Sequence, residues 1–145
     1  WRYLAKARLQ TGDNAGALVA ASNVLAVEDN PSWKADGLLD RGRALLALDR
    51  PAEARTSADE ASALRPQGRT SGGLRILVGD LEMKAGDPKK ASAEYLYVVG
   101  FLEDKELKPL ALHKLVGALE KQGDTTEAEK YRKQLATEFP EWKAP

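Results

Sequence analysis

The sequence has no cysteine, a single histidine and no long apolar run. Without cysteine the chain has no disulfide, no thiolate zinc site and no cysteine nucleophile. The single histidine, His113, has no second histidine with which to form a zinc site within one chain. No apolar stretch approaches the ~18 to 20 residues of a membrane-spanning helix, so we expect no direct membrane insertion. The residue types that remain favour neither a metal cofactor nor any other cofactor.

Net charge is also lacking, because 22 basic residues balance 22 acidic ones. Binding to nucleic acid or to an anionic membrane usually needs a basic patch, so we expect neither as a partner. The chain is 145 residues long and 43% hydrophobic, which is enough for one ordinary domain that buries roughly two thirds of its unfolded surface. Because "WRYLAKARLQTG" is already helical in pattern, we expect the sequence to begin inside a longer protein.

A short pattern recurs four times with a period of 37 residues, starting at residues 9, 46, 83 and 120. The copies read "LQTGDNAGALVAA", "LALDRPAEARTSA", "MKAGDPKKASAEY" and "EKQGDTTEAEKYR". Three copies place a glycine where a left-handed residue can close a helix, and the second copy has Asp49 there. An aspartate able to cap the next helix then follows in the same three copies, and Pro51 and Pro88 suit a first helical turn. Each copy therefore predicts two antiparallel helices joined by a very short turn.

Small and apolar residues recur at fixed places after each turn. Alanine stands four residues after each cap position, which predicts a close approach of paired helices. Apolar residues recur seven positions later, on the same helix face. The two columns are Ala17, Ala54, Ala91 and Ala128, then Val24, Ala61, Val98 and Leu135.

The pattern predicts eight helices in four hairpins and no strand, within one domain over residues 1–145. The expected helices are 1–11, 14–28, 32–48, 51–64, 71–85, 88–102, 109–122 and 125–138, and the expected repeats are 1–31, 32–68, 69–107 and 108–142. Ser32, Thr70 and Ser71 are candidate caps where new repeats begin. The join "FLEDKELKP" is either an extended helix or a charged loop.

These residues resemble the tetratricopeptide repeat family, whose pattern of tryptophan, leucine, glycine, tyrosine, alanine, aromatic and proline spans ~34 residues. Matches to that pattern include Trp1, Leu4, Gly12 and Ala17 in the first repeat, Gly79, Gly86, Ala91 and Tyr95 in the third, and Leu115, Gly123, Ala128 and Pro140 in the fourth. The resemblance implies an α-solenoid, a right-handed superhelix with a concave surface lined by the first helix of each repeat. The last repeat is also similar to those of bacterial cell-envelope coordinator and assembly proteins, which slightly favours the periplasm over the cytoplasm.

The same resemblance implies which side chains face the concave groove. They are Arg2, Lys6, Leu39, Arg43, Ile76, Asp80, Lys84, His113 and Glu120. Family members that clamp a carboxylate tail use lysines and asparagines in this groove. No asparagine occurs among these nine positions, so tail-clamp binding is not predicted.

Catalysis has little support in the sequence. His113 lies on an amphipathic helix without a partner for nucleophilic chemistry, and neighbouring acids such as Asp59 and Glu60 point in different directions on a helix. The stretch "RTSGG", 69 to 73, lacks the strand and the lysine of a phosphate loop and is interpreted as an inter-repeat turn. Two non-enzymatic functions remain open: an adaptor that binds a segment of another protein in its groove, and a scaffold that associates with itself by stacking of repeats.

Overall fold

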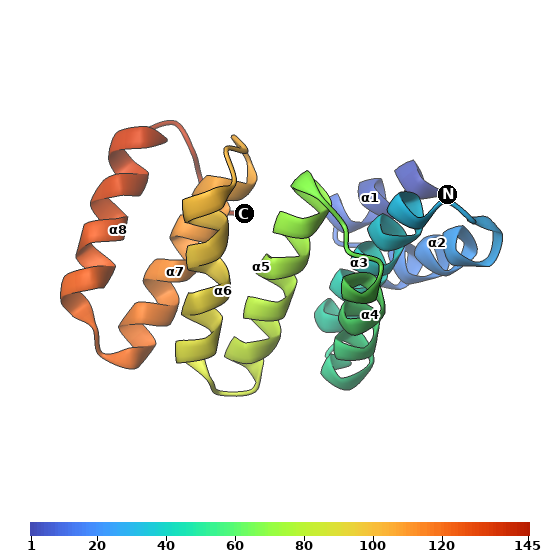
Figure 1. Cartoon of the computed structure of the whole chain (residues 1–145), viewed down its shortest axis with the longest axis horizontal. Coiled ribbons are helices and arrows are strands. Elements are labelled where there is room, and N and C mark those ends of the chain that lie inside the picture. Colours follow the sequence, from blue (N-terminus) through green and yellow to red (C-terminus); the bar gives the residue numbers. More distant parts are fainter. The chain divides into compact units, whose positions relative to one another are not determined.

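The computed structural model describes all 145 residues. They form eight α-helices joined by turns and loops, and no strand (Figure 1). This confirms the all-α fold class. The helices are α1 (Arg2–Gln10), α2 (Asn14–Val27), α3 (Pro31–Ala47), α4 (Pro51–Ala63), α5 (Gly68–Lys84), α6 (Pro88–Phe101), α7 (Leu107–Gln122) and α8 (Thr125–Glu138). None of them combines the length and the apolarity that crossing a membrane requires.

The recurring turns have the backbone geometry that the sequence predicts. Gly12, Gly86 and Gly123 adopt φ angles of 78°, 81° and 79°, and Asp49 adopts the same left-handed region with φ 58°. A left-handed residue reverses the chain directly after a helix, and glycine does so without a clash of its side chain. The second copy therefore closes its helix in the same way in spite of its aspartate.

Aspartate side chains cap the N-termini of three of the four helices that follow these turns. Asp13 accepts a hydrogen bond from the Gly16 amide at 2.9 Å, and Asp87 accepts one from the Lys90 amide at 3.0 Å. Asp124 caps α8 in the same way. Each bond occupies one of the amides that a first helical turn leaves without a partner within the helix. The predicted caps are thus confirmed at these three positions.

Helix α5 begins three residues earlier than predicted, at Gly68. Thr70 and Ser71 therefore lie inside the helix, as Ser32 lies inside α3, whose cap is Asn30. The interpretations of these three residues as caps and of "RTSGG" as a turn are wrong. A side chain at Gly73 would come within 2.9 Å of the Leu39 side chain on α3. The glycine allows α5 to lie close to α3 and does not mark a bend.

The join before α7 is a charged loop, and α7 begins at Leu107, two residues before the predicted start. Asp104 accepts hydrogen bonds from the amides of Glu106 and Leu107 at 2.9 and 2.8 Å. Pro109 then falls within the first turn, where the missing N–H has no partner to lose. Pro109 was therefore a poor guide to the first residue of α7, whereas Pro51 and Pro88 are the first residues of α4 and α6 as predicted.

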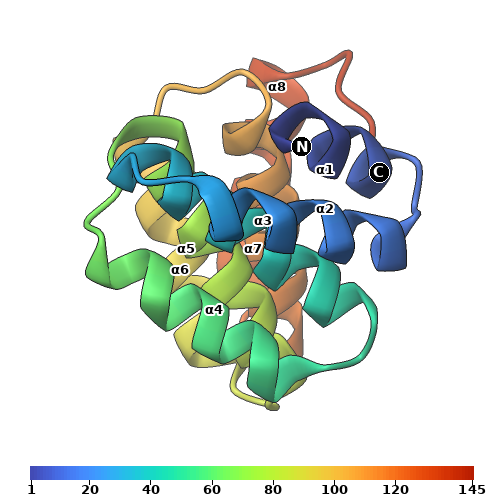
Figure 2. The ribbon, with the colours of Figure 1, turned by 90° about the vertical axis from the view of Figure 1, so that its right-hand side faces the viewer.

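The chain forms two compact units, Trp1–Leu77 and Val78–Pro145. In the first unit α2 packs against α1 and α3, and α3 packs against α4, an order that can be followed in Figure 2. In the second unit α7 packs against α6 and α8. The four alanines that follow the turns are all fully buried, which confirms the predicted close approach of paired helices.

Candidate functional site

In the first unit, predicted groove residues form a cluster of charges around a buried carboxylate. Lys6 Nζ lies 2.9 Å from Asp36 and 2.8 Å from Asp40, and Arg43 approaches the other oxygen of Asp40 at 3.4 Å. Asp40 is only 2% exposed. Burial raises the pKa of the Asp40 carboxyl, because it disfavours the charged form more than the bonds from Lys6 and the charge of Arg43 favour it.

Three further predicted groove residues of this unit have other surroundings. Arg2 lies with its guanidinium 4.5 Å from the centre of the Trp33 ring, a cation–π contact. Leu39 and Ile76 are 2% and 4% exposed. Their side chains belong to the core, so in this structure they offer a partner no surface.

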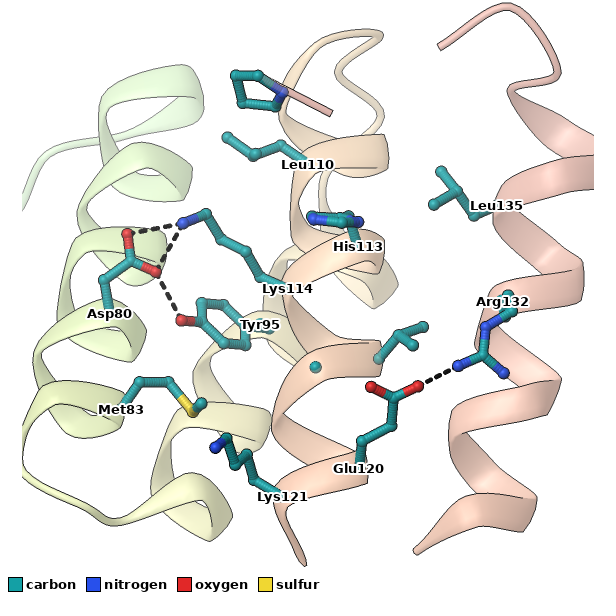
Figure 3. A pocket seen from close by; sticks show the side chains of 13 residues that line it. Asp80, Met83, Tyr95, Leu110, His113, Lys114, Glu120, Lys121, Arg132 and Leu135 are labelled. Atoms are coloured by element: carbon teal, nitrogen blue, oxygen red, sulfur yellow. Dashed lines mark hydrogen bonds and ion pairs between the residues drawn. The ribbon is translucent and has the colours of Figure 1, made fainter. Parts of the chain in front are cut away.

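The second unit contains a pocket of about 810 Å³ (Figure 3). Its wall combines apolar side chains with charged ones from α5, α7 and α8. The lining residues are Asp80, Met83, Tyr95, Leu110, His113, Lys114, Val116, Gly117, Glu120, Lys121, Arg132, Leu135 and Pro145. Such a volume is within the range of sites that take a small molecule or one or two side chains of a peptide.

One face of α7 forms the floor of this pocket. Leu110, Lys114, Gly117 and Lys121 follow one another at intervals of three or four residues, so they lie in a stripe along the helix, and His113 stands beside Lys114 at the edge of this stripe. Figure 3 shows these α7 side chains between α5 and α8, those of Leu110, His113 and Lys114 nearer one end and that of Lys121 nearer the other.

Gly117 explains why there is room above α7. The period of 37 residues places it in one column with Lys6, Arg43 and Asp80, so the last repeat alone lacks a charged side chain at this position. A Cβ atom added at Gly117 would meet no atom within 4 Å. The missing side chain therefore leaves open space in the pocket.

A hydrogen-bonded group closes the α5 side of the pocket. The Tyr95 hydroxyl donates to Asp80 at 2.6 Å, and Lys114 Nζ lies 2.9 Å from the same carboxylate. Tyr95 is buried, and this burial together with the neighbouring Asp80 raises the pKa of its hydroxyl. The phenol therefore remains a proton donor, and both charges of this group are matched.

On the α8 side, Arg132 forms ion pairs with Glu120 and with Glu129. His113 meets the Trp142 ring at 5.5 Å between ring centres. Lys121 forms no hydrogen bond and no ion pair. It is the cation of the pocket whose charge is left for a ligand.

Three of the nine predicted groove residues meet at this pocket: Asp80, His113 and Glu120. Lys84 does not line it. Sequence reasoning missed Lys114 and Lys121, although their spacing from His113 on α7 was a usable signal. It also missed Arg132, which comes from the second helix of its repeat, and the contact of Tyr95 with Asp80, which only the packing of α6 on α5 creates.

The chain has no group of three or more histidine, aspartate or glutamate side chains placed to hold a metal ion. The pocket acids are engaged by cations, and its histidine contacts an aromatic ring rather than an acid. The bonded groups of the lining are Tyr95 and Lys114 on Asp80, and Arg132 on Glu120. What the lining can do is bind apolar and charged groups together.

No protein-family model matches the chain, and no curated protein is similar to it at the level required for a match.

Proposed function

We propose that the chain is a non-catalytic helical-repeat module that binds a segment of another protein, and that its hairpins form a right-handed superhelix of the tetratricopeptide type. The observation that carries the proposal is the pocket of the second unit, which joins apolar walls to an unpaired cation on one face of α7. A repeat architecture with short turns presents such faces to partners as its ordinary mode of action.

The lining indicates the chemistry of the bound segment. Leu110, Val116 and Leu135 supply apolar surface for a side chain of the partner. Lys121 supplies an ammonium group that can meet a carboxylate. The paired groups at Asp80 and Glu120 already satisfy one another, so they shape the pocket more than they attract a charge. We therefore expect a segment with an apolar side chain and an acidic group.

The two glycines Gly117 and Gly100 offer a matched test. An added Cβ meets nothing within 4 Å at either residue, but only Gly117 lines the pocket. Gly117→Leu should place a side chain inside the pocket and obstruct it without disturbing the fold, whereas Gly100→Leu adds the same side chain on α6. The experiment is cross-linking capture from the native source with the unmodified chain and both variants, followed by mass spectrometry.

A partner retained by the Gly100 variant and lost by the Gly117 variant supports the proposal. A partner that both variants retain places the binding site elsewhere and contradicts it. Circular dichroism of the two variants should show the helix content of the unmodified chain, so that a loss of capture reports on the pocket alone.

A second candidate function is a scaffold that associates with itself. It is favoured by exposed apolar side chains on the α1–α2 hairpin, where Tyr3 is 87% and Val27 is 73% exposed and both border a shallow hollow of about 290 Å³. Contiguous exposed apolar surface is typical of an interaction face. Sedimentation equilibrium over a range of concentrations tests this candidate, since a scaffold grows with concentration and a Tyr3→Glu/Val27→Glu variant should stay monomeric.

A further inference from the structure

The residues that follow α8 turn back toward the pocket instead of leaving the molecule. Helix α8 ends at Glu138, and the Trp142 amide donates to the Phe139 carbonyl at 3.1 Å, which reverses the chain. The ring of Trp142 then lies against His113, and Pro145 forms part of the pocket wall. The segment 140–145 therefore lies at the pocket that the proposed function assigns to a partner.

No ion pair and no side-chain hydrogen bond holds this segment in place. Glu141 and Lys143 are exposed and form no ion pair, and the backbone bond from Trp142 lies within the segment itself. The contact between the Trp142 and His113 rings links the segment to α7. Trp142 is partly buried whereas both of its chain neighbours are exposed, so the aromatic ring is the anchor.

We propose that the pocket takes an extended segment carrying an aromatic residue, and that residues 140–145 are a built-in competitor that a partner must displace. This inference rests on the proposed function and adds the class of partner and its regulation. The partner's aromatic ring takes the place of Trp142 on His113, which lines the pocket together with Leu110 and Leu135. Its acidic group reaches Lys121, which the 140–145 segment leaves unpaired.

A tethered competitor weakens binding through its effective concentration. Short flexible tethers give effective concentrations in the millimolar range, so a weak intramolecular contact can still cover the His113 ring for most of the time. The apparent affinity for a partner equals the intrinsic affinity multiplied by the fraction of molecules in which the site is open. Removing the anchor ring should therefore tighten the binding of a competing segment by about two- to tenfold.

The probe is a synthetic heptapeptide with the sequence of residues 139–145, FPEWKAP, titrated into the 145-residue chain. The single histidine gives one imidazole signal by nuclear magnetic resonance, so binding at His113 is read without ambiguity. We expect saturable movement of this signal in the Trp142→Ala chain and a two- to tenfold weaker response in the unmodified chain. Lys143→Ala, a change in the same segment at an exposed side chain without an ion pair, should respond like the unmodified chain.

Equal affinity of the peptide for the Trp142→Ala and unmodified chains would show that residues 140–145 do not compete for the site. Absence of binding to the Trp142→Ala chain would show that the pocket has no subsite for an aromatic ring at His113. A peptide with alanine in place of its tryptophan should not bind, and binding by that peptide would also overturn the subsite. In the unmodified chain, nuclear Overhauser contacts between the rings of Trp142 and His113 are expected, and their absence refutes the inference without any variant. Partner capture with the Gly117 and Gly100 variants is read independently, so the proposed function can survive each of these failures.

Discussion

Lys114 reaches Asp80 across 34 positions of the chain, with Nζ 2.9 Å from the carboxylate. Lys6 reaches Asp40 across the same separation at 2.8 Å. In the 37-residue register, Lys6 and Asp80 share one column, and Asp40 and Lys114 share another. The two units therefore use one pair of positions with the charges exchanged, and each pair ties the first helices of two successive hairpins together.

The Asp80 pair predicts unequal effects of removing its two members. Asp80→Ala leaves the buried Tyr95 hydroxyl without an acceptor, which should lower the free energy of unfolding by about 1 to 3 kcal/mol. Lys114→Ala should cost less than about 1 kcal/mol, because both charged side chains are roughly a third exposed and solvent screens the pair. Urea unfolding of both variants measures the difference.

Tyr95→Phe provides the control for this prediction. In a chain that already carries Tyr95→Phe, the hydroxyl is gone and Asp80→Ala should cost clearly less than in the unmodified chain. An equal cost in the two backgrounds would mean that the bond between Tyr95 and Asp80 does not stabilise the fold.

The buried Asp40 carboxyl predicts in which direction the free energy of unfolding changes with pH. Its pKa is raised in the folded chain, so between the unfolded value of 3.8 and the folded value the native state binds more protons than the unfolded state. The contribution of Asp40 to stability is therefore fully present below pH 3.8 and is lost as the pH rises through its folded pKa. The measurement is the free energy of unfolding of the unmodified chain minus that of Asp40→Asn, from pH 3 upward.

We expect this difference to fall with rising pH and then to level off. Subtraction of the Asp40→Asn curve removes the contributions of the other acids, among them Glu53 and Asp87, whose pKa values are lowered by their partners. A difference that rises with pH would show that Lys6 and Arg43 outweigh the effect of burial.

Ser57 predicts a stabilising substitution. Its side chain is 1% exposed, and its hydroxyl oxygen has no hydrogen-bond partner. A buried polar group without a partner costs free energy, and alanine already stands at the equivalent buried position of the first repeat, Ala20. Ser57→Ala should raise the free energy of unfolding by about 1 kcal/mol, and thermal unfolding followed by circular dichroism checks it. A lower melting temperature would mean that the hydroxyl has a partner in solution.

The turns within the hairpins were predictable because they depend on local chemistry. Gly12 and Asp13 carry the signals for stopping one helix and starting the next within two residues, and both act as expected. The start of α5 was not predictable in this way, because Gly73 is present for the approach of α3, a contact between segments far apart in the sequence. The sequence alone does not show whether a glycine serves a turn or a close contact between helices.

The pocket was predictable only in part, for the same reason. The spacing of His113, Lys114 and Lys121 marks one face of α7, and this could have been found from the sequence. The ring of Trp142 on His113 could not, because it depends on how the chain turns back after α8. The opening at Gly117 is visible in the 37-residue columns, but only the packing shows that the absent side chain leaves space.

Gly79 and Gly117 predict opposite responses to one added methyl group. An alanine at Gly79 would overlap the ring of Tyr95, which is buried and bonded to Asp80 and so cannot move aside. Overpacking of this kind should cost about 1 to 3 kcal/mol. At Gly117 the methyl group enters open space, and replacing glycine inside a helix should stabilise the fold by roughly 0.5 to 1 kcal/mol. Urea unfolding of Gly79→Ala and Gly117→Ala measures both, and changes of the same sign would contradict the close packing of α6 on α5 that positions the pocket wall.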